Sequence, residues 1–276
     1  MYGVATHAEL LASRSPKAIR HAAQSGSLQR LRHGIYSGPD PSLPARVRAV
    51  QVAIPRAVAS HATAAALLGF GEHRGPLHVT VPHALALHST RDVVVHRDRH
   101  PTPSVQVGGL PVTTAVRTVL DLARSSSRVE GVVAADAALD AGLCTRAELL
   151  GGLDDCRGRT GAALARQAVS LCRVGAESPM ETRLRLLVVD AGLPEPVLQH
   201  RVMTSIGELR LDQAWPHLLR SLEYDGYEPH STKAAFARDR ARWRALAAAG
   251  WAVSPVTYAD LLHPERLLAE LRLALA

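Results

Sequence analysis

The sequence predicts a multidomain protein of mixed α+β and α/β class. Its length of 276 residues exceeds that of an average single domain. Short helical and strand-like patterns fill residues 1–38, and a linker marked by Pro39, Pro41 and Pro44 follows. Near residue 175 the pattern becomes helix, strand, strand, strand, helix, strand, helix. We therefore expect domains at residues 1–38, 39–172 and 173–276.

The composition excludes several classes of protein. Hydrophobic residues make up 47% and charged residues 21%, which is typical of a soluble globular chain. No apolar stretch is long enough to cross a bilayer and no secretory signal is recognisable, so we expect a cytoplasmic protein without a membrane partner. Cys144, Cys156 and Cys172 are widely spaced, which argues against a disulfide framework or a zinc knuckle.

The charge balance favours an anionic partner. The formal net charge is +7, and nucleic acid is the commonest partner of such a chain. Lysine occurs only at Lys17 and Lys233, however, and a GC-rich genome produces the same arginine and alanine bias without any DNA binding. The positions of the arginines therefore matter more than their number.

Residues 1–38 predict a winged helix. Thr6 and Glu9 fit a capping box, and Ser15-Pro16 begins a second helix that ends before Gly26. Residues 28–36 predict a two-stranded wing. In a winged helix the second helix enters the major groove and the wing contacts backbone phosphate. The side chains expected to contact DNA are Lys17, Arg20, His21, Arg30 and Arg32. A helical pair with a charged surface and no ligand is the alternative.

Residues 39–172 contain little recognisable chemistry. Helices are predicted at 45–54 and 60–68, strands at 77–81, 93–95 and 110–113, and helices at 114–123, 129–141, 146–153 and 162–172. Seven histidines between His61 and His100 raise a metal-site hypothesis, but their spacing is irregular and we predict exposed or hydrogen-bonded loop histidines. The chain lacks a Gly-x-Ser-x-Gly elbow and a glycine-rich phosphate loop, which disfavours a serine hydrolase or a P-loop enzyme.

Two sets of motifs resemble AbiEi-type antitoxins of abortive-infection toxin-antitoxin systems. The first set resembles their N-terminal winged helix and comprises Gly3-Val4-Ala5-Thr6, Ala18-Ile19-Arg20, Gly26-Ser27-Leu28 and Arg32-His33-Gly34-Ile35-Tyr36. The second resembles the segment that follows and comprises Gly109-Leu110-Pro111-Val112-Thr113-Thr114, Arg117-Thr118 and Leu120-Asp121-Leu122-Ala123. The resemblance implies one module from residue 1 to about 170, with duplex DNA and a cognate toxin protein as partners.

Carboxylates lie near the ends of two predicted strands in residues 173–276. Helices are predicted at 178–191 and 231–249, and strands at 197–203, 208–214, 218–224 and 251–256. A hairpin of the second and third strands would bring Asp212 beside Glu223 and Asp225, which share one face of their strand; His230 follows. Clustered carboxylates repel one another, and a hard cation such as Mg²⁺ stabilises such a cluster.

The order of these elements is that of the restriction-endonuclease-like PD-(D/E)XK fold, and the segment resembles Vsr-like (very-short-patch-repair) endonucleases. The resemblance implies hydrolysis of DNA phosphodiester bonds with Mg²⁺ (or Mn²⁺). It implies that Asp212 and Asp225 bind the metal and that His230 acts as general acid/base. Glu223 and Glu181 would support the site, although Glu181 also fits position N3 of a capping box.

The helix predicted at 231–249, which follows the acidic residues in the chain, carries several arginines. Arg238 and Arg242 are expected to face either solvent or a phosphate backbone. The nuclease superfamily commonly carries a lysine where this chain has Asp225, and the Vsr-like relatives often carry an arginine where it has Pro255. The principal alternative is therefore a non-catalytic antitoxin or transcriptional autorepressor with a degenerate nuclease fold. An RNA-processing or nucleic-acid-scaffold role is a third hypothesis, and the sequence does not define an oligomeric state.

Overall fold

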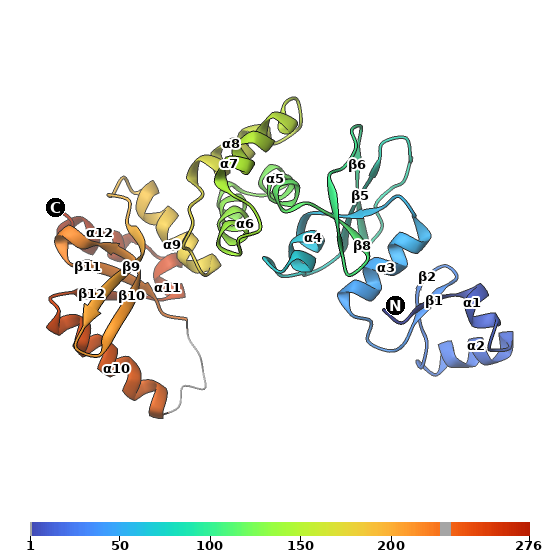
Figure 1. The fold of residues 1–276 in the computed structure, drawn as a ribbon, viewed down its shortest axis with the longest axis horizontal. Helices are drawn as coiled ribbons and strands as arrows, with labels where there is room; N and C mark the ends of the chain where they lie inside the picture. The colour runs from blue at the N-terminus through green and yellow to red at the C-terminus, as the bar shows by residue number, and fades with distance from the viewer. Residues whose placement is uncertain (1, 227–232) are drawn as a thin grey trace. The chain divides into compact units, whose positions relative to one another are not determined.

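The computed structural model describes residues 2–226 and 233–276 (Figure 1). The chain divides into two compact units. The N-terminal unit comprises Met1–Ser126 and Ala147–Ala165, and the C-terminal unit comprises Ser127–Arg146 and Arg166–Ala276. The multidomain α/β class is confirmed, while the winged-helix and restriction-endonuclease-like folds and the boundaries at 38/39 and 172/173 stay predictions.

A small sheet with two helices forms the start of the chain. Its elements are β1 (Val4–Thr6), α1 (His7–Leu11), α2 (Pro16–Gln24), β2 (Gln29–Arg32) and β3 (Ile35–Ser37), and the strand order is β1-β3-β2. Thr6 and Glu9 form the predicted capping box, and Ser15 Oγ accepts from Ala18 N at 3.3 Å. The two helices and the hairpin are therefore confirmed. Strand β1 was missed because three residues show no periodicity.

A five-stranded sheet with two helices follows. Its helices are α3 (Leu43–Ala53) and α4 (His61–Leu68), and its strands are β4 (Val58–Ala59), β5 (Leu77–Pro82), β6 (Val93–Asp98), β7 (Ser104–Val107) and β8 (Leu110–Thr113), in the order β6-β5-β4-β8-β7. Val47 and Val50 of α3 pack with Val79 and Val112 of the sheet in a continuous core. Gly69 ends α4 with φ 88°, a left-handed conformation that favours glycine. All predicted elements of this segment are confirmed, and the sequence missed β4 and β7.

Helices dominate the next segment, as predicted. They are α5 (Ala115–Ser125), α6 (Arg128–Asp140), α7 (Arg146–Gly152), the 3₁₀ helix η1 (Leu153–Cys156) and α8 (Ala162–Leu171). Each predicted helix agrees with the observed one to within two residues. Within residues 2–226 and 233–276, none of the helices is long and apolar enough to span a membrane.

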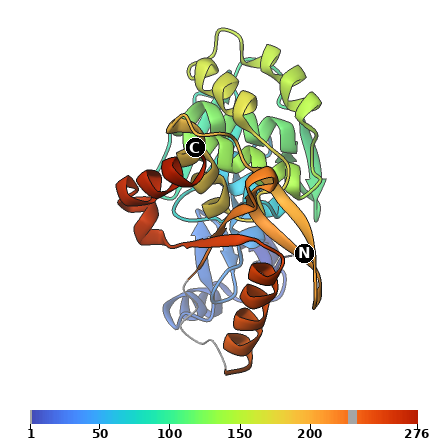
Figure 2. The same cartoon turned by 90° about the vertical axis from the view of Figure 1, so that its left-hand side faces the viewer.

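A four-stranded sheet covered by helices completes the C-terminal unit (Figure 1 and Figure 2). Its elements are α9 (Pro179–Asp190), β9 (Val197–Thr204), β10 (Gly207–Trp215), η2 (Pro216–Leu218), β11 (Arg220–Tyr224), α10 (Lys233–Ala248), β12 (Ala252–Val256), α11 (Tyr258–Leu262) and α12 (Glu265–Ala274). The strand order is β12-β11-β10-β9, with β11 and β12 parallel and the other pairs antiparallel.

Two hydrophobic clusters hold this sheet. Leu184 of α9 and Leu267 of α12 pack with Leu222 of β11 in one cluster, and Leu246 of α10 packs with Leu211 of β10 in the other. The predicted helices and strands are present, but the third strand begins later than predicted. Leu218, the expected first residue, ends η2 instead, and the chain then turns through Leu219, which has a left-handed conformation (φ 51°).

A buried ion pair joins α6 to α9 inside the C-terminal unit. Arg185 Nη2 lies 2.7 Å from Asp136 Oδ2, and the two side chains are 1% and 0% exposed. Asp136 also accepts from Arg173 N at 2.7 Å and from Thr182 Oγ1 at 3.0 Å. Burial raises the pKa of Asp136, while the charge of Arg185 acts in the opposite direction. This pair fixes the helix that carries Glu181 against its neighbour.

We predict that Arg185→Leu lowers the free energy of unfolding by about 3–5 kcal/mol, because the substitution leaves Asp136 buried without its counter-ion. Arg266→Leu is the matched control: Arg266 pairs with Glu270 on the surface, and its loss should lower the free energy of unfolding far less, because water solvates both charges. All three tryptophans lie in the C-terminal unit, so urea unfolding followed by tryptophan fluorescence reports on this unit alone. Equal costs for the two substitutions would contradict the prediction.

Candidate functional site

Glu181 lies in the first turn of α9 with its side chain buried. Ser178 Oγ accepts from Glu181 N at 3.1 Å, as expected for an N-cap. The Glu181 carboxylate accepts from Glu177 N at 3.0 Å, so the reciprocal bond of the capping box is made one residue earlier than expected. Gln199 Nε2 donates to the same oxygen at 3.3 Å. Burial raises the pKa of Glu181, which favours the protonated form.

Asp212 lies on β10 beside the end of β11. Tyr224 N donates to Asp212 Oδ2 at 3.2 Å across the two strands. Burial raises the pKa of Asp212 to about 6, and the charges of Glu181 and Glu223 act in the same direction. Glu181, Asp212 and Glu223, which we call the acidic cluster, are therefore close enough to repel one another.

The positive charge of Arg242 compensates the negative charge of Glu223 in the acidic cluster. Arg242 Nη2 of α10 lies 2.7 Å from Glu223 Oε1, and the same nitrogen donates to the carbonyl oxygen of Arg210. The Arg242 guanidinium, predicted to contact DNA, is thus engaged inside the C-terminal unit. Asp212 has no such ion pair among the described residues.

The remaining predicted residues lie around the acidic cluster or beyond it. Asp225 follows β11 with an exposed side chain, and its backbone N donates to Val256 O at 2.8 Å. Arg238 is exposed on α10, and His230 lies outside the described residues. The assignment of Asp212 and Asp225 as metal ligands stays a prediction.

Side-chain oxygens that could serve as metal ligands lie near the acidic cluster. Gln213 Nε2 donates to Glu181 O at 2.8 Å. In the part of the chain that the structure describes, Gln213 Oε1 and Gln199 Oε1 are buried without a hydrogen-bond partner. Carboxylate and amide oxygens are the donors that a hard cation takes, so the residues present fit Mg²⁺. Three ligand atoms within 4.8 Å of one another do not occur here, however; among described residues only His61, His78 and His96 reach that spacing.

The predicted DNA-contacting residues form a basic face on residues 1–38. Helix α2 buries Ile19 and Ala22, which leaves Lys17, Arg20 and His21 exposed. This segment holds five arginine or lysine side chains and one carboxylate, Glu9, which is used in the cap of α1. We define the N-terminal basic face as Arg14, Lys17, Arg20, His21, Arg30 and Arg32. None of its members forms an ion pair with a carboxylate in residues 2–226 or 233–276.

The hairpin of β2 and β3 also contributes to a basic hollow. Arg30 and Arg32 line a cavity of about 430 Å³ together with Arg46 and Arg91. The carboxylate of Asp92 also lies in its wall. Guanidinium groups that converge in this way favour an anionic ligand such as a phosphate.

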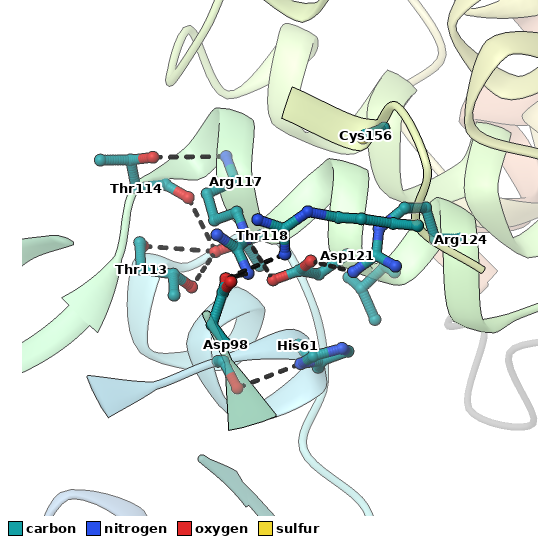
Figure 3. A network of polar contacts seen from close by, with 12 residues as sticks. His61, Asp98, Thr113, Thr114, Arg117, Thr118, Asp121, Arg124 and Cys156 are labelled. Carbon is teal, nitrogen blue, oxygen red and sulfur yellow. Dashed lines mark hydrogen bonds and ion pairs between the residues drawn. The ribbon is translucent and has the colours of Figure 1, made fainter. Parts of the chain in front are cut away.

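Sequence reasoning missed a network of ion pairs centred on Arg117 (Figure 3). Arg117 Nη2 lies 2.6 Å from Asp98 Oδ2, and Arg117 Nε lies 2.7 Å from Asp121 Oδ2. Arg124 and Arg159 complete the network at 2.7 Å from Asp121 and 2.9 Å from Asp98. Burial alone would raise the pKa of Asp98, but hydrogen bonds, led by that from Arg159, hold it well below the usual range. The network joins β6, α5 and the loop before α8.

An open cavity of about 1120 Å³ lies over the network, and six arginines and four histidines are among the residues that line it. The prediction of loop histidines is wrong for three of the seven histidines. His61 begins α4, His78 lies on β5 and His96 lies on β6. The parallel register of β5 with β6 brings His78 near His96, and the hydrogen bond from Ser60 N to His78 O brings His61 beside them. No local pattern in the sequence specifies these contacts.

The comparisons with known proteins identify one domain and the family. Residues 57–171 match the family of the AbiEi antitoxin C-terminal domain. Rv2248 and MT2308, described as uncharacterized proteins of two Mycobacterium tuberculosis strains, are each 34% identical over 252 residues, which is 90% of this chain and 92% of theirs.

Among solved structures, the crystal structure of the RV2827C protein from Mycobacterium tuberculosis aligns with 72% of this chain and 83% of its own, at 16% identity and a TM-score of 0.44. The extent and identity of the match to Rv2248 and MT2308 define the family. The chain belongs to the family of these two mycobacterial proteins, and its residues 57–171 match the AbiEi antitoxin C-terminal domain.

Proposed function

We propose that this protein is a DNA-binding antitoxin of the AbiEi type that represses transcription of its own operon and binds a cognate toxin protein. The observation that carries the proposal is the AbiEi antitoxin domain at residues 57–171, preceded in the chain by the N-terminal basic face. The toxin partner is inferred from the family description alone. The duplex DNA partner is inferred from the charges on α2 and on the hairpin of β2 and β3.

The N-terminal basic face suits a phosphate backbone. Its side chains are exposed, apart from the half-buried Arg32, and lack carboxylate partners within the described residues, so binding DNA breaks no ion pair. The caps at Thr6 and Ser15 set where α1 and α2 begin, which fixes the direction in which Lys17 and Arg20 project. Release of counterions from DNA then supplies much of the binding free energy.

Charge reversal on α2 tests this proposal. We predict that Lys17→Glu with Arg20→Glu weakens binding to the promoter DNA of the protein's own operon at least tenfold. The slope of log affinity against log salt should fall by about 1 for each phosphate group that the variant no longer neutralises. Mobility-shift titrations at several salt concentrations measure both quantities, and competition with RNA separates a DNA regulator from an RNA-binding protein.

The matched control is Arg201→Glu with Arg266→Glu, which makes the same change of charge on exposed arginines of the C-terminal unit. The control should lose less affinity for DNA. Its loss should be equal for the promoter DNA and for DNA of unrelated sequence. If the α2 variant and the control lost affinity equally, the N-terminal basic face would not be the DNA-binding surface.

A metal-dependent DNA endonuclease is a second candidate, which the acidic cluster favours. Asp212 and Glu223, with Asp225 at the end of the same strand, would hold Mg²⁺ or Mn²⁺. The bound cation would neutralise phosphate charge and lower the pKa of a water molecule. Glu181 would orient the ligands, and the ion pair with Arg242 would hold the Glu223 side chain in place. We rank this candidate second because Asp225 replaces the lysine common in such sites.

The raised pKa of Asp212 predicts a dependence of stability on pH. The folded state retains a proton that the unfolded state releases between about pH 4 and pH 6, so stability is greatest below pH 4 and falls as the pH rises through 6. Asp212→Asn should reduce this fall by about 1–2 kcal/mol, a value discounted for partial exposure. Urea unfolding at several pH values measures the difference between the two proteins, and identical pH profiles would show that the cluster does not perturb Asp212.

A cleavage assay separates the two candidates. We predict that supercoiled plasmid stays intact with the purified protein and Mg²⁺ or Mn²⁺, because the antitoxin proposal requires no catalysis. Nicked or linear plasmid whose formation is abolished by Asp212→Ala would replace this proposal with the endonuclease.

A further inference from the structure

Three imidazoles from three elements of the N-terminal unit converge. One ligand nitrogen from each of His61, His78 and His96 lies within 4.8 Å of the others. His78 Nδ1 and His96 Nε2 are 3.0 Å apart. The parallel register places Thr80 opposite His96, so His78 and His96 point to the same face of the sheet. His61 reaches them from the start of α4, where Ser60 N donates to His78 O at 3.0 Å.

The three side chains are held in the form that binds a metal. Burial, followed by the neighbouring imidazoles, lowers the pKa of His61 to about 2 and that of His96 to about 4. Burial also lowers the pKa of His78. Burial thus favours the neutral form of each imidazole, which keeps a lone pair for coordination. Ser60 Oγ lies 3.0 Å from His61 Nδ1 and can accept a hydrogen bond from the Nδ1–H tautomer, which leaves His61 Nε2 as the ligand atom.

Two further features point to a ligand at this place. The Thr80 side chain is 2% exposed, and its hydroxyl has no hydrogen-bond partner among the described residues although it lines the cavity beside His61 and His96. His61 has φ 51°, a left-handed conformation that is costly for a residue other than glycine and is found most often at functional sites.

The charged side chains near the three imidazoles balance one another, so they would not repel a cation. Arg117 and Arg124 approach the imidazoles, but Asp98 and Asp121 compensate them through the ion pairs of the network. The compensation matters because uncompensated guanidinium groups would repel a divalent ion.

We propose that His61, His78 and His96 form a binding site for a transition-metal ion of the Zn²⁺ class, with its fourth coordination position open to the large cavity. Imidazole nitrogen is the ligand type that Zn²⁺, Co²⁺ and Ni²⁺ share, and three protein ligands with one open position are typical of an accessible zinc site. The Thr80 hydroxyl would donate to, or accept from, the group in the fourth position.

Metal binding requires one imidazole ring to turn. Two nitrogens on a tetrahedral zinc are separated by about 3.3 Å, close to the 3.0 Å between His78 and His96. The rings of His61 and His96 are stacked with centroids 3.6 Å apart, so one ring must turn about its side-chain torsions for both to coordinate one ion. Stacking of two neutral rings resists this turn weakly.

Co²⁺ titration of the full chain tests the proposal, since Co²⁺ substitutes for Zn²⁺ and absorbs visible light when four-coordinate. We expect one equivalent to produce intense visible absorption, which Zn²⁺ then abolishes by displacement. His96→Gln and His78→Gln should each lose the absorption. The matched controls His83→Gln and His100→Gln, on exposed histidines of the same cavity, and Asp212→Asn in the acidic cluster should keep it.

Circular dichroism without metal first establishes that each variant folds. His78 is only partly buried, so His78→Gln serves if His96→Gln does not fold. Zn²⁺ should also raise the midpoint of thermal unfolding of the wild type and leave that of His78→Gln unchanged. Absence of visible absorption in the wild type, or equal absorption in the wild type and His78→Gln, would overturn the proposal.

Discussion

The charge of a buried carboxylate must be compensated, and arginine supplies that compensation at Asp98, Asp121 and Asp136. Through these pairs β6 is joined to α5 in the N-terminal unit and α6 to α9 in the C-terminal unit. Removal of Arg185 would leave Asp136 buried without its counter-ion, whereas Asp98 and Asp121 each pair with two arginines. The packing of both units therefore depends on a few guanidinium groups, which explains part of the arginine content without reference to DNA.

Two of the functional proposals concern places where charged side chains lack a partner of opposite charge within residues 2–226 and 233–276, and the third concerns neutral histidines. On the N-terminal basic face the positive side chains have no carboxylate partners in the described part of the chain, which favours an external polyanion. In the acidic cluster Asp212 forms no ion pair among the described residues, and its raised pKa reflects burial together with repulsion from Glu181 and Glu223, which the charge of Arg242 offsets only in part. The histidine cluster presents neutral ligands beside a network that is already balanced. The basic face thus favours an anionic partner, whereas the acidic cluster and the histidine cluster both favour a cation.

Local signals made much of the fold predictable from the sequence. The caps at Thr6 and Ser15 and the helix stop at Gly69 set helix ends that the structure confirms. The approach of Asp212 to Glu223 was also predictable, because a hairpin of adjacent strands relates them. Strands of two or three residues such as β1 and β4 show no periodicity and were missed. The contacts of Arg242 with Glu223 and of His78 with His96 depend on tertiary packing, which local patterns do not encode.

The central claim is that the segment 1–38 binds duplex DNA while the acidic cluster does not. Hydrogen–deuterium exchange of the full chain, with and without promoter DNA, tests it most directly. We predict slower exchange in α2 and in the hairpin of β2 and β3, and unchanged exchange around Asp212 and Glu223. Slower exchange confined to the ends of β10 and β11 would contradict the account and indicate that the C-terminal sheet engages DNA.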